Sequence, residues 1–170
     1  MGAGLYPPPI NLSAPRGLKA YQGLASTATV TVETRCYLIT WNAEAGRSYR
    51  IVGQFGCVDS EGITQTTTFT QAQNSAIIRA RWAVGTDATT TSADLGYILA
   101  TVFDTDSQMS SGTTAVWHLL NAPAGPVSVA VTLCPYKTPA TTYGSVRLLN
   151  TGGTSNTLSV EDVGSWPLPA

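Results

Sequence analysis

His118 is the only histidine in the sequence, so any nucleophile–base pair built on an imidazole would have to use it. It lies in the apolar run 116–120, and the chain has no GxSxG motif to supply a serine nucleophile. Metal sites made of several histidines are excluded because there is only one. The sequence therefore predicts that His118 is a core or cross-strand hydrogen-bonding residue and not a catalytic base.

Asp104 and Asp106 are the carboxylates whose spacing suits chemistry best, because residues two apart on a strand point to the same side. A pair of carboxylates is what glycosidases need. The spacing also begins like a calcium loop, but Met109 and Ala115 stand where that loop has glycine and glutamate. We expect these carboxylates to cap backbone amides in a turn. The sequence thus predicts no catalytic residue, no metal and no cofactor.

The three cysteines, Cys36, Cys57 and Cys134, do not have the spacing of a zinc site or a disulfide framework. Each lies in or beside an apolar run, where a thiol behaves as a small buried hydrophobe. Whether two of them form a disulfide stays an open question at this point.

Composition excludes several classes of partner. Only 11% of the residues are charged and the net charge is −1, and the two lysines, Lys19 and Lys137, are far apart in the sequence. Binding to a phosphate backbone needs several converging basic residues, so we expect no nucleic-acid partner. No apolar stretch approaches the ~20 residues of a membrane helix, so we expect no membrane partner. Two interpretations of the neutral, hydroxyl-rich composition stay open. The surface is partly covered by neighbouring proteins, or the protein is simply rich in strands that expose threonine.

Short apolar or alternating runs separated by turn residues fill the middle of the chain. Valine, isoleucine, threonine and aromatic residues dominate them, as is typical of strands. The expected strands are 27–32, 36–41, 49–55, 77–84, 95–103, 115–120, 127–133, 145–149 and 157–160. Run 127–133 alternates, which predicts one solvent-facing side, whereas 117–120 does not, which predicts a strand covered on both faces. At most one helical turn is expected, at 71–75.

This rhythm predicts an all-β fold, an antiparallel β-sandwich of jelly-roll type, over residues 19–163. An extended, proline-rich N-terminal arm precedes it at 1–18, and a short C-terminal tail follows at 164–170. The arm and tail carry the residues that we expect to form an assembly interface: Leu5, Tyr6, Pro7, Pro8, Pro9, Ile10, Leu12 and Trp166. The alternative is that the arm folds back on its own sandwich.

Four tryptophans are candidates for a carbohydrate-stacking platform. Trp41, Trp82 and Trp117 lie within expected strands, which favours the core, while Trp166 in the tail suits an interface anchor.

Three short motifs follow one another in the order 14–21 (APRGLKAY), 42–51 (NAEAGRSYRI) and 158–164 (LSVEDVG). They resemble small virion proteins and tail-fibre end domains of phages that infect actinobacteria, with a PRG-x-x-x-Y segment, an A-x-A-G-R-x-Y-R strand entry and a V-E-D-x-G end. The resemblance implies a β-sandwich displayed on the particle, with a trimer as one form, and carries over no catalytic residue. In physical terms, Gly46 suits a turn, and Glu161-Asp162 can pair with Arg47 and Arg50 across strands or subunits.

The expected function is that of a bacteriophage virion structural protein. It would be a capsid decoration or tail-associated subunit, assembled in the host cytoplasm, that docks through its arm on other virion proteins and forms a homo-oligomer. The alternative is a host-receptor or cell-wall glycan binding module of the tail, and a glycan-cleaving enzyme is the third reading. Capsid and tail locations stay open.

Overall fold

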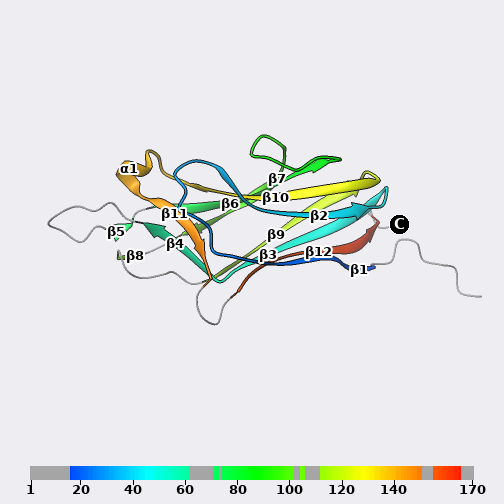
Figure 1. Cartoon of the computed structure of the whole chain (residues 1–170), viewed down its shortest axis with the longest axis horizontal. Helices are drawn as coiled ribbons and strands as arrows, with labels where there is room; N and C mark the ends of the chain where they lie inside the picture. The colour runs from blue at the N-terminus through cyan, green and yellow to red at the C-terminus, as the bar shows by residue number, and fades with distance from the viewer. Residues whose placement is uncertain are drawn as a thin grey trace, which may run out of the picture.

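A computed structural model describes residues 16–61, 71–72, 74–101, 104–105, 112–150 and 155–165. Within these residues the chain is almost entirely β-structure (Figure 1). Two four-stranded antiparallel sheets carry the fold. Their strands are β1 (Gly17–Leu24), β2 (Thr34–Ala43), β3 (Arg47–Phe55), β6 (Ser75–Val84), β7 (Ala93–Thr101), β9 (Thr113–Ala122), β10 (Gly125–Pro135) and β12 (Asn156–Ser165). The predicted all-β antiparallel sandwich is therefore confirmed.

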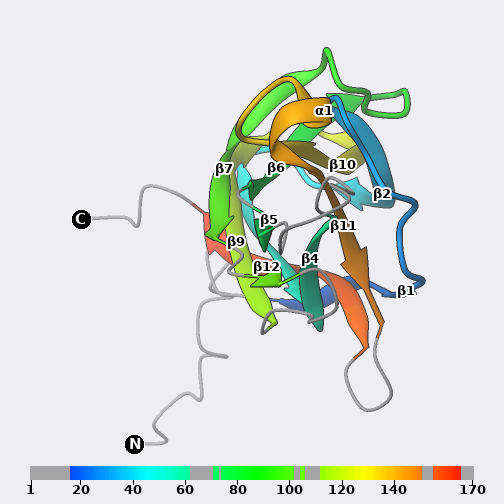
Figure 2. The same cartoon turned by 90° about the vertical axis from the view of Figure 1, so that its left-hand side faces the viewer.

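The strand order is that of a jelly roll. One sheet runs β1-β12-β3-β9 and the other β2-β10-β6-β7. If the eight long strands are counted along the chain, the first sheet takes the first, eighth, third and sixth, and the second takes the second, seventh, fourth and fifth. Figure 2 looks along the sandwich, with β1 near β2 on one side and β7 near β9 on the other. The edges of the two sheets therefore meet on both sides of the core.

Alternating side chains of the two sheets fill the space between them. Tyr49 and Ile51 of β3 and Val129 and Val131 of β10 are fully buried there. Gly53 is required for this packing, because a Cβ at its position would lie 2.7 Å from the Cζ atom of Phe55.

Smaller elements close the end of the sandwich opposite the β2–β3 turn (Figure 1). They are β4 (Cys57–Glu61), which pairs with β11 (Ser145–Leu149), β5 (Gln71–Ala72), which pairs with β8 (Asp104–Thr105), and the short helix α1 (Ala140–Tyr143). The loop between β1 and β2 crosses to β11, where Val30 and Val146 exchange backbone hydrogen bonds of 2.8 and 3.1 Å.

Three local predictions were wrong. Residues 27–32 form this loop with one isolated bridge and not a strand. At 71–75, where at most one helical turn was expected, Gln71 and Ala72 form β5 and Ser75 begins β6. The observed solvent exposure of β10 and β9 is the reverse of the prediction: the outward side chains of β10 are largely buried, whereas those of β9 are exposed. In β10, Ala130 and Thr132 are buried on the outer face, because β10 is a central strand and Ala130 lies between Leu38 and Arg81 of its neighbours. β9 is an edge strand whose outward side chains are exposed.

The paired strands extend slightly past the boundaries expected for the domain. β1 begins at Gly17 and β12 ends at Ser165, so that Leu18 and Gly164 are strand residues. Gly17 is paired with Asp162, and Ser165 with Arg47. Both ends of the described chain therefore leave the same sheet at the same end.

Candidate functional site

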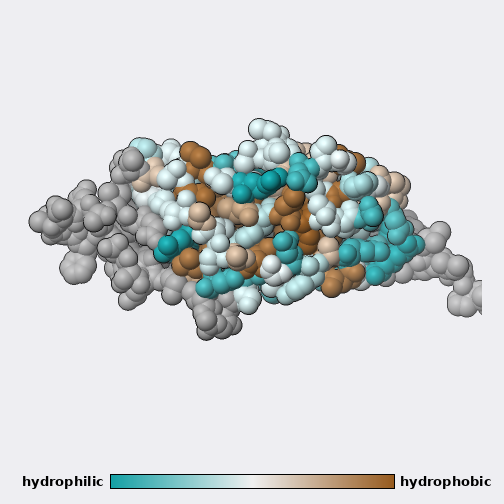
Figure 3. Space-filling model, in the orientation of Figure 1, coloured by the Kyte–Doolittle hydropathy of each residue, from teal (hydrophilic) through white to brown (hydrophobic). Residues whose placement is uncertain are grey.

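Five charged residues meet where the β2–β3 turn lies beside the start of β1 and the end of β12. We call this group the corner cluster: Arg16, Lys19, Glu44, Arg47 and Asp162. Figure 3 shows hydrophilic residues gathered at this end of the molecule. All three motifs noted in the sequence contribute to the cluster, although they are far apart along the chain.

The centre of the corner cluster is a buried ion pair. The Nε atom of Arg47 donates a hydrogen bond of 2.7 Å to Oδ2 of Asp162, and its second amino group donates one of 2.5 Å to Oδ1. Both residues are less than 5% exposed. The Gly164 N–H donates a further bond of 2.9 Å to Oδ1 of Asp162. A carboxylate with this many donors is a stable acceptor and not a proton donor.

The pKa of Asp162 reflects this arrangement. Burial by itself raises the pKa, because it penalises the charged form. The hydrogen bonds from Arg47 and Gly164 and the charges of Arg47 and Lys19 outweigh burial, so the pKa lies below its ordinary value. The Arg47 pKa is raised, chiefly by its hydrogen bonds to Asp162. Both groups stay charged at neutral pH.

Arg16 connects the corner cluster to the start of the described chain. Its backbone N–H donates to the carbonyl of Asp162 at 3.2 Å, and its guanidinium lies 2.5 Å from Oε2 of Glu44. Glu44 is itself fixed, since its backbone N–H donates a bond of 2.9 Å to the hydroxyl of buried Tyr49. Arg16, near the end of the N-terminal arm, is thus held on the sandwich at two points.

The sequence prediction that Glu161 and Asp162 pair with arginines is confirmed within the chain. Because adjacent strand residues face opposite sides, Asp162 reaches Arg47 inside while Glu161 accepts from Arg50 Nε at 3.0 Å on the outer face. The Arg16–Glu44 pair was not predicted, although Arg16 stands in the quoted PRG segment.

Every arginine of the chain forms an ion pair, and each pairs with a different carboxylate. The pairs are Arg16–Glu44, Arg35–Asp87, Arg47–Asp162, Arg50–Glu161, Arg79–Asp94, Arg81–Glu33 and Arg147–Asp59. Every carboxylate whose side chain the structure describes is a member of one of these pairs. No described carboxylate is therefore placed as an unpaired general acid or base.

His118 is exposed on the outer face of β9, opposite Arg50 of β3. Of the two roles predicted for His118, the core position is wrong, because β9 turns its neighbours Trp117 and Leu119 inward and His118 outward. The cross-strand hydrogen-bonding role stays a prediction. The side chains of Asp104 and Asp106 lie outside the described residues, and only the backbone of Asp104 is placed, in β8. Among the described residues, no group of three or more His, Cys, Asp or Glu side chains is arranged to hold a metal ion.

The tryptophans in strands belong to the interior, as predicted. Trp41 and Trp117 are buried, and Trp82 is partly buried against the core. Trp41 and Trp117 are therefore not available as a stacking surface for sugar. The expected interface residues of the arm and tail, from Leu5 to Leu12 and at Trp166, lie outside the described residues.

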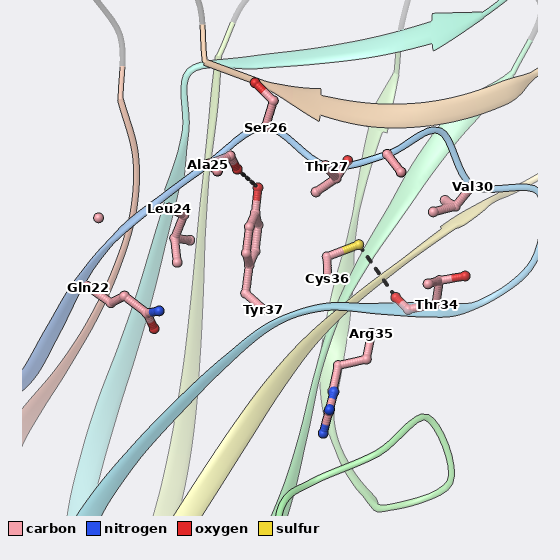
Figure 4. A pocket seen from close by; sticks show the side chains of 12 residues that line it. Gln22, Leu24, Ala25, Ser26, Thr27, Val30, Thr34, Arg35, Cys36 and Tyr37 are labelled. Atoms are coloured by element: carbon pink, nitrogen blue, oxygen red, sulfur yellow. Dashed lines mark hydrogen bonds between the residues drawn. The ribbon is translucent and has the colours of Figure 1, made fainter.

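A groove of about 350 Å³ lies between the β1–β2 loop and the beginning of β2 (Figure 4). Leu24, Val30, Cys36 and Tyr37 give it a largely apolar lining. Two of its polar groups have partners within the protein: the Tyr37 hydroxyl donates to the carbonyl of Ala25 at 2.7 Å, and the thiol of Cys36 lies 3.6 Å from the carbonyl of Thr34.

Cys36 is poorly suited to act as a nucleophile in this groove. Burial raises the pKa of its thiol to about 11, so little thiolate is present near neutral pH. None of the three cysteines is in a disulfide in the structure. The groove can accept a small apolar group, but its geometry provides no reaction.

No helix in the described part of the chain has the length and apolar character needed to cross a membrane. A comparison with curated proteins finds no significant match. Among solved structures, the chain is similar to one in the structure of the infectious bursal disease virus Gx strain, at 10% identity and a TM-score of 0.24. That match covers 89% of this chain and 42% of the other, so this chain spans less than half of the viral protein's length. At this TM-score the similarity carries no argument about function.

One family model covers almost the whole sequence, including the arm, the corner cluster and the start of the tail. It matches residues 1–168, and the chain therefore belongs to the family described as a domain of unknown function, DUF7298.

Proposed function

We propose that this protein is a structural subunit of a bacteriophage particle, a capsid decoration or tail-associated protein, that is held on the particle by its N-terminal arm. The jelly roll is a fold of many viral capsid domains, but lectins and cupins share it. Fold alone does not determine function. The proposal therefore rests on how this sandwich holds the end of its arm.

The observation that carries the proposal is the attachment of Arg16. A backbone hydrogen bond to Asp162 and an ion pair with Glu44 hold this residue at one end of the sandwich. The buried Arg47–Asp162 pair in turn fixes β12 to β3 at the same point. A pull on the arm would be transmitted to the central strands of one sheet. This is what a subunit tethered by its N-terminus requires.

The sequence before Arg16 suits such a tether. Three consecutive prolines, Pro7, Pro8 and Pro9, favour an extended conformation, and Leu5, Tyr6 and Ile10 beside them are apolar. Ordering a stiff segment on a partner costs little conformational entropy. The resemblance to actinobacterial phage virion proteins also supports the proposal, because its motif residues Arg16, Arg47 and Asp162 form the corner cluster.

The charge pattern supports a structural role over catalysis or glycan binding. Described carboxylates are neutralised by arginines, and of the tryptophans in strands Trp41 and Trp117 are buried and Trp82 is partly buried. Sugar-binding sites generally expose an aromatic platform and polar side chains with unused hydrogen-bonding capacity. In the groove beside β2 the aromatic side chain, Tyr37, is buried and its hydroxyl is already hydrogen-bonded to the carbonyl of Ala25, so it offers no such platform.

The test is to purify phage particles from a strain that encodes this protein and quantify their proteins by mass spectrometry. We expect the chain to be present in many copies per particle, as a repeated lattice or tail component is. Its absence from particles purified by density gradient, with the protein present in the lysate, would overturn the proposal.

A further inference from the structure

The outer face of the β1-β12-β3-β9 sheet has exposed apolar side chains at both edges. On β1, Leu18 and Tyr21 are 59% and 63% exposed, and on β9, Val116 and Leu120 are 46% and 48% exposed. We call this surface the β1/β9 face and include in it the central pair Arg50 and Glu161. A partner that covered the whole face would remove these apolar groups from water.

Two opposite charges lie at the centre of this face. Arg50 on β3 and Glu161 on β12 are cross-strand neighbours, and β3 and β12 are the two inner strands of the sheet. Nε of Arg50 donates to Oε2 of Glu161 at 3.0 Å, and both side chains remain partly exposed. Their remaining hydrogen-bonding atoms can therefore meet a second pair of charges.

The register places these groups in rows across the sheet. One row contains Tyr21, Ser159, Val52 and Val116, and the next contains Leu18, Glu161, Arg50 and His118. In each row the β1 and β9 residues lie at equal distances from the line midway between β12 and β3. A twofold axis that runs above the face, directly over that line and parallel to the strands, would place the β1 edge of a second copy over the β9 edge of the first.

We infer that the partner of the β1/β9 face is a second copy of this chain, packed face to face about this twofold axis. The rotation brings Tyr21 of each copy over Val116 of the other, so exposed apolar groups cover one another. It also brings Arg50 of each copy over Glu161 of the other, so the four charges alternate in sign. A surface that is complementary to itself in this way is what a twofold interface requires.

The expected dimer is weak. Four strands at ~4.8 Å spacing and about nine residues at ~3.3 Å each make a face of roughly 20 Å by 30 Å. This is near the lower size limit of specific interfaces, so we expect a Kd on the order of micromolar. The inference goes beyond the proposed function and does not depend on the arm. A chain lacking residues 2–13 is expected to dimerise like the full chain.

Charge reversal tests the inference directly by sedimentation equilibrium of the full-length chain. Arg50→Glu leaves two negative charges at the centre of the face, and Glu161→Arg leaves two positive charges. We expect each variant alone to raise the Kd by about tenfold or more. An equimolar mixture of the two is expected to restore dimerisation to within about threefold of the wild type, because each variant then faces the opposite charge. Repulsion within one chain cannot produce that rescue.

Matched control variants distinguish a specific effect of the β1/β9 face on dimerisation from the general effect of changing a surface residue. Arg35→Glu reverses a similarly exposed arginine on the other sheet and should leave the Kd unchanged. Val116→Thr should weaken the dimer, whereas Val32→Thr, at a valine exposed in the β1–β2 loop, should not. Circular dichroism verifies the fold of each variant. A monomeric wild type at ~200 µM, well above the expected Kd, or no rescue in the mixture of folded variants, would overturn the inference.

Discussion

The guanidinium of Arg47 and the carboxylate of Asp162 form a two-point ion pair between residues that are 115 positions apart in the sequence. The pair joins the beginning of β3 to the end of β12, and Arg16 is hydrogen-bonded to the backbone of the same aspartate. One buried contact thus fixes the last strand of the jelly roll and the point from which the N-terminal arm leaves.

Asp162→Asn is expected to destabilise the protein strongly. The change leaves the buried Arg47 guanidinium without its carboxylate, and breaking a buried pair from one side costs about 3–5 kcal/mol. Glu161→Gln is the matched control, because its partner Arg50 is partly exposed and such pairs contribute less than about 1 kcal/mol. Urea unfolding followed by circular dichroism measures both. Equal effects of the two changes would show that the buried pair has no special role.

Stability should fall on acidification. The pKa of Asp162 lies below its ordinary value of 3.8, and that of Glu33, which accepts hydrogen bonds from Arg81 and Thr132, lies below its ordinary value of 4.5. A carboxyl with a lowered pKa in the folded state stabilises it above the ordinary pKa, and this contribution is lost as pH falls through the folded-state value.

The free energy of unfolding should therefore be level from about pH 7 to 5 and decrease below that. Asp162→Asn should show a smaller decrease than the wild type. If the variant lost as much stability on acidification as the wild type, Asp162 would not contribute to the acid sensitivity.

His118→Asn should change the free energy of unfolding by less than about 0.5 kcal/mol, because His118 is exposed on an edge strand. Trp117→Ala, one position away, should cost about 3–5 kcal/mol, because Trp117 is buried in the core. Thermal and urea unfolding of the two variants give the comparison. A large loss with His118→Asn would mean that the outer face of β9 is packed against something.

The thiols should react slowly in the folded protein. Burial raises the pKa of Cys36 to about 11 and also raises that of Cys134, and Cys57 is buried. At pH 8, Cys36 then has about a hundredfold less thiolate than an ordinary cysteine. A disulfide-exchange reagent should modify the native chain far more slowly than glutathione, and modify three thiols once the chain is unfolded in urea. Rapid modification of Cys36 at pH 8 would contradict the raised pKa of its thiol.

The sequence predicted the elements whose hydrophobic pattern is strong and local. β11 was predicted with its observed bounds, and β3, β6 and β10 within a few residues. β1 was not predicted, because glycines at 17 and 23 and a register shift after Leu18 interrupt its alternation. β4 was not predicted, because Asp and Ser, here Asp59 and Ser60, are typical of turns. In the structure Arg147 pairs with the buried Asp59 carboxylate.

The exposure of β9 and β10 could not be derived from their own residues. Trp117 to Leu120 are apolar apart from His118, so their sequence does not show which side faces the core. What decides it is that β9 is an edge strand and β10 a central one, and strand order is a non-local property. The corner cluster was foreseen only in part: arginine–carboxylate pairing followed from the motifs, but the Arg16–Glu44 contact depends on how the three segments meet.

Deletion of residues 2–13 tests the central claim, that the arm holds the jelly roll on a virus particle. Particles are produced in cells that supply either the full chain or the shortened chain, and the occupancy of each is measured by quantitative mass spectrometry of purified virions. The shortened chain keeps Arg16 and every described strand, so we expect the same β-type circular dichroism spectrum and the same unfolding midpoint as the full chain. We predict that it is nevertheless lost from the particles. Incorporation of the folded, shortened chain at normal occupancy would contradict the account.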